Sequence, residues 1–231
     1  MVSSPVVAVD GPAGSGKSSV CRGVAERLGL RYLDTGAMYR AMTWAMLDSG
    51  VDVSDQQSIL ERARTVTIVS GTDPISPTIH VGEIDVAAPI RGDEVTSAVS
   101  AVSAVPEVRE QLVALQRAEV QAAREAGEGI IVEGRDITTV VLPDADLKVF
   151  ITADPAVRAA RRARQDEGLG KTGVDVAATE TALVERDAKD SSRATSPLAQ
   201  AEDAVVLDTT TLTLDDVIAE MCRMVDGSTT S

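Results

Sequence analysis

The segment at residues 6–28 constrains the fold of this chain more than any other. Four apolar residues and an acid (6–10) precede Gly-Pro-Ala-Gly-Ser-Gly-Lys-Ser (11–18), and a helical pattern begins at Lys17. The octapeptide fits G-x-x-x-x-G-K-[ST], a phosphate-binding loop (P-loop), in the strand–loop–helix context that this motif requires. Its glycines let backbone N–H groups surround an anion, and the helix N-terminus adds partial positive charge. The segment therefore predicts a nucleoside triphosphate site in an α/β fold.

Within this loop, individual side chains have distinct expected roles. Lys17 is expected to reach the β- and γ-phosphates of ATP, and the Ser18 hydroxyl to bind Mg²⁺. Glu133 ends the apolar run 130–133, where an acid can hold the same ion, although Asp is more usual there. Asp10 and Asp34 end two other predicted strands and are expected at the same edge of the sheet, where ligands bind. The full set predicted to bind ATP is Gly11, Pro12, Ala13, Gly14, Ser15, Gly16, Lys17, Ser18 and Ser19.

Short apolar runs alternate with longer helical patterns along the rest of the chain. Continuous apolar runs are typical of parallel strands buried on both faces. Strand–helix–strand repetition therefore predicts a doubly wound α/β fold with a parallel five-stranded sheet. The strands are expected at 6–10, 31–33, 130–133, 147–151 and 204–208, and the helices at 17–28, 37–48, 106–126, 155–166 and 176–189.

Two segments interrupt this alternation. Turn signals at 71–74 and 81–83 separate short β-rich runs, which predicts a small antiparallel insert, and a helix is expected at 94–103. The Gly-rich stretch 166–175 has the composition of a mobile lid, and also that of a plain surface loop. The resulting division is core at 1–62, an insert at 63–105, core at 106–157, a lid region at 158–190, and core with a C-terminal helix at 191–231.

Charge and composition limit the partners. The formal net charge is −14, which disfavours nucleic acid as a partner, while 18 of the 22 basic residues are Arg, the side chain that binds phosphate in bidentate fashion. No apolar run approaches the ~18 residues of a membrane span, and no signal peptide is evident. The two cysteines have no metal-site spacing. We expect a cytoplasmic protein with no membrane partner, and a monomer because no exposed apolar seam is apparent.

The P-loop alone leaves the function open, because GTPases, ATPases and kinases share it. The chain contains no Asn, so it lacks the N-K-x-D guanine-reading element of GTPases. Three segments that each carry Arg (34–40, 133–136 and 185–193) follow elements that should bring them to one sheet edge. They favour a kinase with a phosphorylated acceptor over a P-loop switch without one, or a structural protein with a relic loop. An acceptor such as AMP, UMP or shikimate stays an alternative.

Together with residues 11–19, these three segments resemble bacterial cytidylate kinase. They read Asp-Thr-Gly-Ala-Met-Tyr-Arg (34–40), Glu-Gly-Arg-Asp (133–136) and Glu-Arg-Asp-Ala-Lys-Asp-Ser-Ser-Arg (185–193). Residues 89–110, 140–145 and 206–210 extend the resemblance over nearly the whole chain, from about 6 to 221. It implies phosphoryl transfer from ATP, with Mg²⁺, to CMP or dCMP.

The resemblance also implies a role for each matching residue. The acceptor phosphate would be held by Thr35, Arg40, Arg135 and Arg193. The cytosine would be read by Ser100, Arg109 and Asp136, and the ribose contacted by Arg186 and Asp190. Closure over the transferring phosphoryl group would involve Arg158, Arg161 and Arg162. A carboxylate at 136 can accept from the cytosine amino group, whereas uracil would present an acceptor to it. Asp187 and Lys189, in contrast, are expected to be surface charges.

Overall fold

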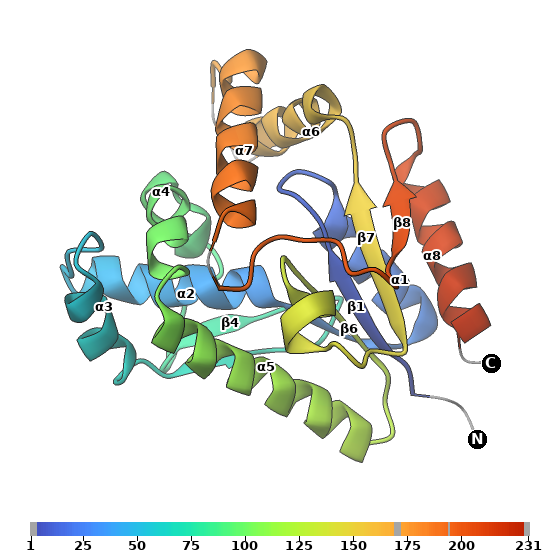
Figure 1. The fold of residues 1–231 in the computed structure, drawn as a ribbon, viewed down its shortest axis with the longest axis horizontal. Helices are drawn as coiled ribbons and strands as arrows, with labels where there is room; N and C mark the ends of the chain where they lie inside the picture. The colour runs from blue at the N-terminus through green and yellow to red at the C-terminus, as the bar shows by residue number, and fades with distance from the viewer. Residues whose placement is uncertain (1–3, 169–171, 194, 229–231) are drawn as a thin grey trace.

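In the computed structural model, which describes residues 4–168, 172–193 and 195–228, the main sheet has five parallel strands. They are β1 (Val6–Asp10), β2 (Arg31–Asp34), β6 (Ile130–Gly134), β7 (Leu147–Thr152) and β8 (Val205–Asp208). Their order, β2-β6-β1-β7-β8, places β1 in the middle of the sheet (Figure 1). The predicted doubly wound parallel sheet is confirmed, and each predicted strand lies within one residue of its observed bounds at either end.

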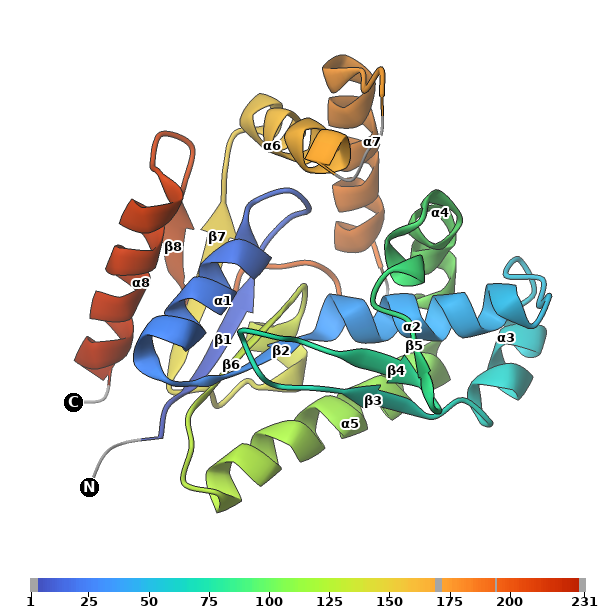
Figure 2. The ribbon, with the colours of Figure 1, turned by 180° about the vertical axis from the view of Figure 1, so that it is seen from behind.

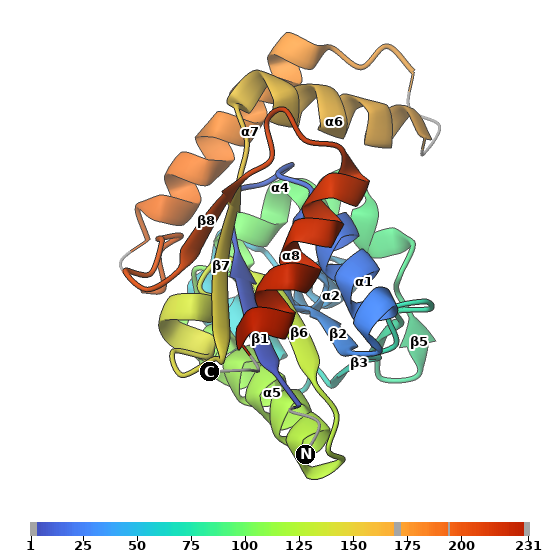
Figure 3. The same cartoon turned by 90° about the vertical axis from the view of Figure 1, so that its right-hand side faces the viewer.

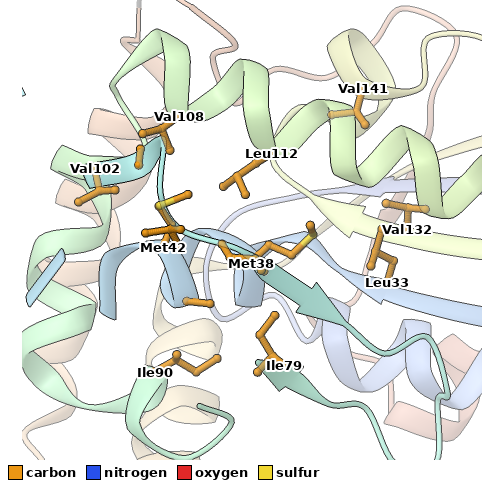
Figure 4. Close-up of a cluster of buried hydrophobic side chains, with 14 of the residues drawn as sticks. Leu33, Met38, Met42, Ile79, Ile90, Val102, Val108, Leu112, Val132 and Val141 are labelled. Atoms are coloured by element: carbon orange, nitrogen blue, oxygen red, sulfur yellow. The ribbon is translucent and has the colours of Figure 1, made fainter. Parts of the chain in front are cut away.

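Helices cover both faces of this sheet because its central strands are apolar on both faces. Val7 and Val9 of β1 pack in the cluster formed with α1 (Lys17–Leu28) and α8 (Leu214–Ser228), which lie side by side (Figure 3). Val6 and Ala8 pack in the opposite cluster with α2 (Thr35–Asp48) and α5 (Pro106–Glu125). Figure 4 shows this second cluster, in which Met and branched aliphatic side chains fill the space that aromatic residues occupy in many cores.

The predicted antiparallel insert forms between β2 and β6. Its strands are β3 (Ile68–Ser70), β4 (Ile79–Val81) and β5 (Ile84–Asp85), and they lie beside α2 (Figure 2). A short 3₁₀ turn η1 (Pro89–Arg91) and helix α4 (Asp93–Val102) follow. Helix α3 (Gln56–Ala63), which precedes the insert, is absent from the sequence prediction. Its signal is Asp55, which caps the helix by accepting from the N–H groups of Gln57 and Ser58.

Two helices, α6 (Pro155–Gly168) and α7 (Val176–Ser191), pack against each other beyond the carboxyl ends of the strands (Figure 1). They form most of the predicted lid region. Helix α6 continues to Gly168, two residues further than predicted, so the predicted loop begins later. Residues 169–171 of that loop lie outside the described residues.

Three further features bear on compartment, membrane insertion and metal binding: the cysteines, the apolar content of the helices, and clusters of metal-ligating side chains. Cys21 and Cys222 are both free and buried. No helix in the described part of the chain has the length and apolar content needed to cross a membrane. Within the same ranges, no group of three or more His, Cys, Asp and Glu side chains could hold a metal ion.

Candidate functional site

A cavity of about 870 Å³ lies at the carboxyl ends of the central strands. The P-loop, α2, α6, α7 and the insert contribute to its lining, and so does the segment after β8. All three segments that the sequence predicts to meet at one sheet edge (34–40, 133–136 and 185–193) contribute side chains to it. The long reach of this cavity, from residues 209–217 to the insert, gives it room for two ligands.

The P-loop needs glycine at positions where a side chain would collide or the backbone is left-handed. A Cβ on Gly11 (φ +152°) would lie 2.0 Å from the Ile151 carbonyl oxygen. Gly14 and Gly16 have φ of +75° and +86°, and Gly16 caps α1. Behind the loop, Lys17 Nζ donates to the Pro12 carbonyl (3.3 Å). The loop therefore curves tightly over β7 before the helix begins.

Gly11→Ala is expected to lower the free energy of unfolding by about 2–4 kcal/mol, because the new methyl group must displace the backbone of β7. Urea unfolding followed by circular dichroism measures this. Gly227→Ala is the matched control, since a Cβ there meets nothing within 4 Å. That change lies in a helix and is expected to stabilise by about 0.5–1 kcal/mol. Equal stability of Gly11→Ala and the parent protein would contradict the close approach.

A lysine and a glutamate form the charged floor of the cavity. Burial, and then the positive charge of Arg135, lower the pKa of Lys17 to about 8. Burial, and then the negative charge of Asp34, raise the pKa of Glu133 to about 7. Tyr32 and Ser18 donate their hydroxyls to the Glu133 carboxylate. Ser18 and Glu133 thus bring two hard oxygen donors together where carboxylates repel each other, a donor set that fits Mg²⁺.

Arginines from several elements crowd the middle of the cavity. Burial and repulsion by Arg162 lower the pKa of Arg40 to about 10, and burial and repulsion by Arg135 lower the pKa of Arg186 to about 10. Burial also lowers the pKa of Arg193. Arg186 Nε is buried and has no hydrogen-bond partner among the described residues. Mutual repulsion among these buried guanidiniums fits the binding of a phosphate dianion between them.

Thr35 and Asp190 form hydrogen bonds with residues next to or within this arginine cluster. The Thr35 hydroxyl lines the cavity and donates to the Glu133 carbonyl (2.7 Å). Asp190, only 2% exposed, accepts from Arg135 (3.2 Å) and from Arg193 (2.5 Å). Asp190 therefore orients two of the arginines that the sequence predicts to bind phosphate.

A buried ion pair lies at the insert end of the cavity. Arg109 donates to Asp136 (2.5 Å) and to the Ser103 carbonyl (3.2 Å), and its guanidinium lies 5.2 Å from the centre of the Tyr39 ring. Ser103 Oγ accepts from Arg193 (3.0 Å), so this serine connects the buried ion pair to the arginine cluster. Both charges of the pair line the cavity and are almost completely buried.

Ser100, predicted to read the base, lies near the C-terminal end of α4, and its carbonyl accepts from Ser103 Oγ (3.3 Å). Among the described residues, Ser103 lines the cavity and Ser100 does not. Sequence reasoning did not single out Ser103, because no local pattern in the Ser-rich helix distinguishes the two hydroxyls. The role of Ser100 stays a prediction.

The arginines of α6 divide into two groups. Arg161 lines the cavity and donates to Thr209 Oγ1 (2.9 Å) and to the Thr209 carbonyl (2.7 Å), and Arg162 lines it and pairs with Asp166 (3.1 Å). Arg158 is buried outside the cavity, where Ala153, Ala13 and Asp187 accept its hydrogen bonds. The prediction that Arg158 closes over the transferring group does not fit this arrangement, in which protein acceptors occupy its guanidinium. Asp187, which pairs with it, is not a surface charge.

Two anchoring residues are missed or misread by sequence reasoning. Asp10, expected to face a ligand, is fully buried and accepts from the N–H groups of Ile137 (2.9 Å) and Thr138 (2.8 Å) and from the Thr138 hydroxyl (2.7 Å). It thereby fixes the π-helical turn η2 (Ile137–Val141) that follows Asp136. Tyr32 holds Glu133 from the neighbouring strand. An acid at a strand end does not reveal which way it points, and a Tyr in a strand does not reveal its partner.

Known proteins resemble this chain over almost its whole length. The family model described as Cytidylate kinase matches residues 7–227. The cytidylate kinases of Streptomyces griseus and Streptomyces avermitilis are 57% and 56% identical over 225 residues, covering 97% of this chain and 94% of their own. A crystal structure of an uncharacterized protein from Eubacterium ventriosum aligns with a TM-score of 0.50 and 14% identity, covering 96% of this chain and 98% of its own. That last likeness concerns the fold alone.

Proposed function

This chain belongs to the cytidylate kinase family and phosphorylates CMP or dCMP with ATP, and from this premise we propose that the cavity at the carboxyl edge of its sheet holds both substrates end to end. The observation that carries the proposal is the crowding of arginines beside the P-loop, where Arg40 and Arg186 repel neighbouring guanidiniums. A polyanion at each side of the cluster would relieve that repulsion.

The donor triphosphate is proposed to lie in residues 11–19. Backbone N–H groups of the loop and the ammonium of Lys17 would hold its oxygens. The buried Ser15 hydroxyl, which has no hydrogen-bond partner in the described part of the chain, supplies a further donor. Arg161 and Arg162, which line the cavity from α6, are proposed to approach the transferring group from the other side.

Mg²⁺ is proposed to bind at the hydroxyl of Ser18 and the carboxylate of Glu133. When bound, the ion neutralises charge on the β- and γ-phosphate oxygens. The hydroxyl of Tyr32 keeps the Glu133 carboxylate in one orientation. The two carboxylates of Glu133 and Asp34 repel each other across this place, which supports binding of a cation.

Glu133→Gln is expected to raise the free Mg²⁺ concentration needed for half-maximal turnover by about 10-fold, because the amide removes one negative charge from the site. Titration of Mg²⁺ at fixed ATP and CMP measures the shift, and excess EDTA should abolish turnover. Glu128→Gln is the matched control at an exposed position before the same strand. An unchanged Mg²⁺ requirement would contradict the assignment of Glu133.

On the acceptor side, Arg40, Arg135, Arg193 and Thr35 are proposed to bind the phosphate. Arg109, Asp136 and Ser100 would read the cytosine, and Ser103, which lines the cavity beside Arg109, would add a further hydroxyl. Arg186 and Asp190 would contact the ribose. Contact of Asp190 with two of the phosphate-binding arginines supports a single connected site.

The reaction then needs little covalent chemistry from the protein. An anionic oxygen of the acceptor phosphate attacks the γ-phosphorus, and the bond to the bridging oxygen of ADP breaks, so no general base is required. Positioning by the arginines and exclusion of water are the proposed contributions of this chain. Positive charge around the transferred group favours the transition state, in which charge spreads over its oxygens.

ADP production from Mg·ATP with CMP, dCMP, UMP, AMP, GMP or no acceptor tests the function. Turnover is expected with CMP and dCMP, and discrimination against UMP of roughly 10²-fold, because uracil leaves the Asp136 carboxylate facing an acceptor. Preference for another monophosphate would keep the kinase and overturn the base site. Hydrolysis without an acceptor would overturn the acceptor site.

The protein is also proposed to act in the cytoplasm and as a monomer. Two free, buried cysteines support a reducing compartment. Light scattering with and without both substrates measures the molecular mass, and a mass twice that of the chain would contradict the monomer.

A further inference from the structure

The two helices beyond the sheet hold one residue of the P-loop, Ala13, by both of its backbone groups. The Ala13 N–H donates to Asp187 Oδ1 (3.1 Å) on α7. The Ala13 carbonyl accepts from Arg158 Nη1 (3.0 Å) on α6. Arg158 and Asp187 also pair with each other. The two hydrogen bonds to Ala13 and the Arg158–Asp187 ion pair thus form a closed ring of interactions that includes Ala13.

Apolar contacts hold the same residue. The Ala13 methyl group packs in a small buried cluster with Ala159 of α6 and Leu183 of α7. A Cβ on the next residue, Gly14, would lie 3.1 Å from the Arg158 carbonyl oxygen and 3.4 Å from Leu183. The P-loop therefore packs closely between α6 and α7, and the Arg158 side chain forms part of this contact.

The two bonds fix two successive peptide planes: the bond to Asp187 holds the Pro12–Ala13 plane, and the bond from Arg158 holds the Ala13–Gly14 plane. In a trans peptide the carbonyl and the following N–H point in opposite directions. Because the Ala13 carbonyl points to Arg158, the Gly14 N–H points the other way, away from α6. Glycine tolerates either orientation of this plane at little cost, and Gly14 already has φ of +75°. Rotation of the plane would direct a carbonyl dipole toward the place of the donor phosphates and remove an N–H from it.

We propose that Arg158 is a positioning residue that locks the Ala13–Gly14 peptide in the orientation that binds the donor triphosphate, and that Asp187 supports it by pairing with Arg158 and by holding the preceding Pro12–Ala13 peptide. The inference rests on the proposed donor site at residues 11–19. Neither side chain touches substrate in this arrangement. Loss of the pair is expected to weaken ATP binding and to leave CMP binding unaltered, because the acceptor site uses other residues.

Calorimetric titration with Mg·ATP and, separately, with CMP tests this inference on the full chain. Asp187→Ala is expected to raise the Kd for ATP by about 10-fold, as the loss of a partly buried charged acceptor does, and to change the Kd for CMP by less than about 2-fold. Asp187→Asn keeps an acceptor for the Ala13 N–H but not the charge, and a smaller increase is expected. Glu185→Ala, an exposed acid on the same helix, is the matched control.

The outcomes distinguish failure of the positioning role from failure of the proposed donor site at residues 11–19. An unchanged Kd for ATP in both Asp187 variants, or an equal loss of ATP and CMP binding, would overturn the positioning role. If Asp187→Ala does not fold, Asp187→Asn carries the same comparison. Lys17→Ala tests the donor site itself: if it leaves the Kd for ATP unchanged, the proposed donor site fails, whatever Asp187 does.

Discussion

Replacing Lys17 with Ala is expected to lower kcat roughly 10³-fold while the protein stays folded. The ammonium group is buried at the floor of the cavity, where a charge acts on the transferred group through little water. Its removal deletes the one basic side chain of residues 11–19 and leaves the backbone N–H groups and hydroxyls of the loop as its remaining donors. The larger share of the loss is expected in kcat, because negative charge on the bridging oxygen grows in the transition state.

Steady-state ADP production with saturating Mg·ATP and CMP measures this loss. Lys189→Ala, an exposed lysine on α7, is the matched control and should keep kcat unchanged. Thermal unfolding shows whether the fold is retained, which is expected because the hydrogen bond that the Lys17 ammonium donates within the described residues, to the Pro12 carbonyl, is long (3.3 Å). A kcat within about tenfold of the parent value would remove Lys17 from the catalytic role.

Asp136→Asn is expected to lower kcat/KM for CMP by roughly 10²-fold and to narrow the preference for CMP over UMP to less than about 10-fold. The amide has nearly the same shape as the carboxylate, but it offers a donor as well as an acceptor. It can therefore accept from the cytosine amino group less strongly and can donate to the uracil oxygen. The change also leaves the buried charge of Arg109 without its ion-pair partner, at a cost in stability of about 3 kcal/mol.

The ratio of kcat/KM for the two acceptors separates specificity from stability, because a purely structural defect would lower both values together. Asp144→Asn, an exposed acid beyond the π-helical turn, is the matched control. Retention of the full preference for CMP in Asp136→Asn would show that other groups read the base.

Local patterns are sufficient to predict the framework of this fold. Helix α1 has its predicted bounds because Gly16 caps it and Gly29, with φ of +66°, ends it, and both are visible as sequence signals. The central strands are predicted from their apolar runs, which must be covered on both faces. Helix α3 was missed because only Ile59 and Ala63 of its eight residues are buried, so its apolar stripe is too short to stand out.

The partners of buried charges could not be predicted in the same way. Asp187 binds the backbone of a residue 174 positions earlier, and Asp10 binds N–H groups that lie 127 and 128 positions later. No periodicity or spacing connects residues so far apart, and both acids stand in segments rich in charge or at strand ends. The arginines of α6 show the same limit. Arg158, Arg161 and Arg162 cannot be distinguished by sequence, but only Arg161 and Arg162 of these three line the cavity.

The central position of β1 bears on how the chain acquires its shape as it leaves the ribosome. Residues 6–10 pair with 130–134 on one side, and residues 7–10 pair with 147–150 on the other. The carbonyl of Ile151 lies over Gly11. Strand β1 therefore has no neighbour until residues 130–134 have been synthesised and lacks its second neighbour until residues 147–150 follow, and contacts of such long sequence separation form slowly. Nascent chains that end before β7 should be cut by proteases at residues 11–18. Protection of these residues from cleavage should appear only once residues 147–152 have left the ribosome.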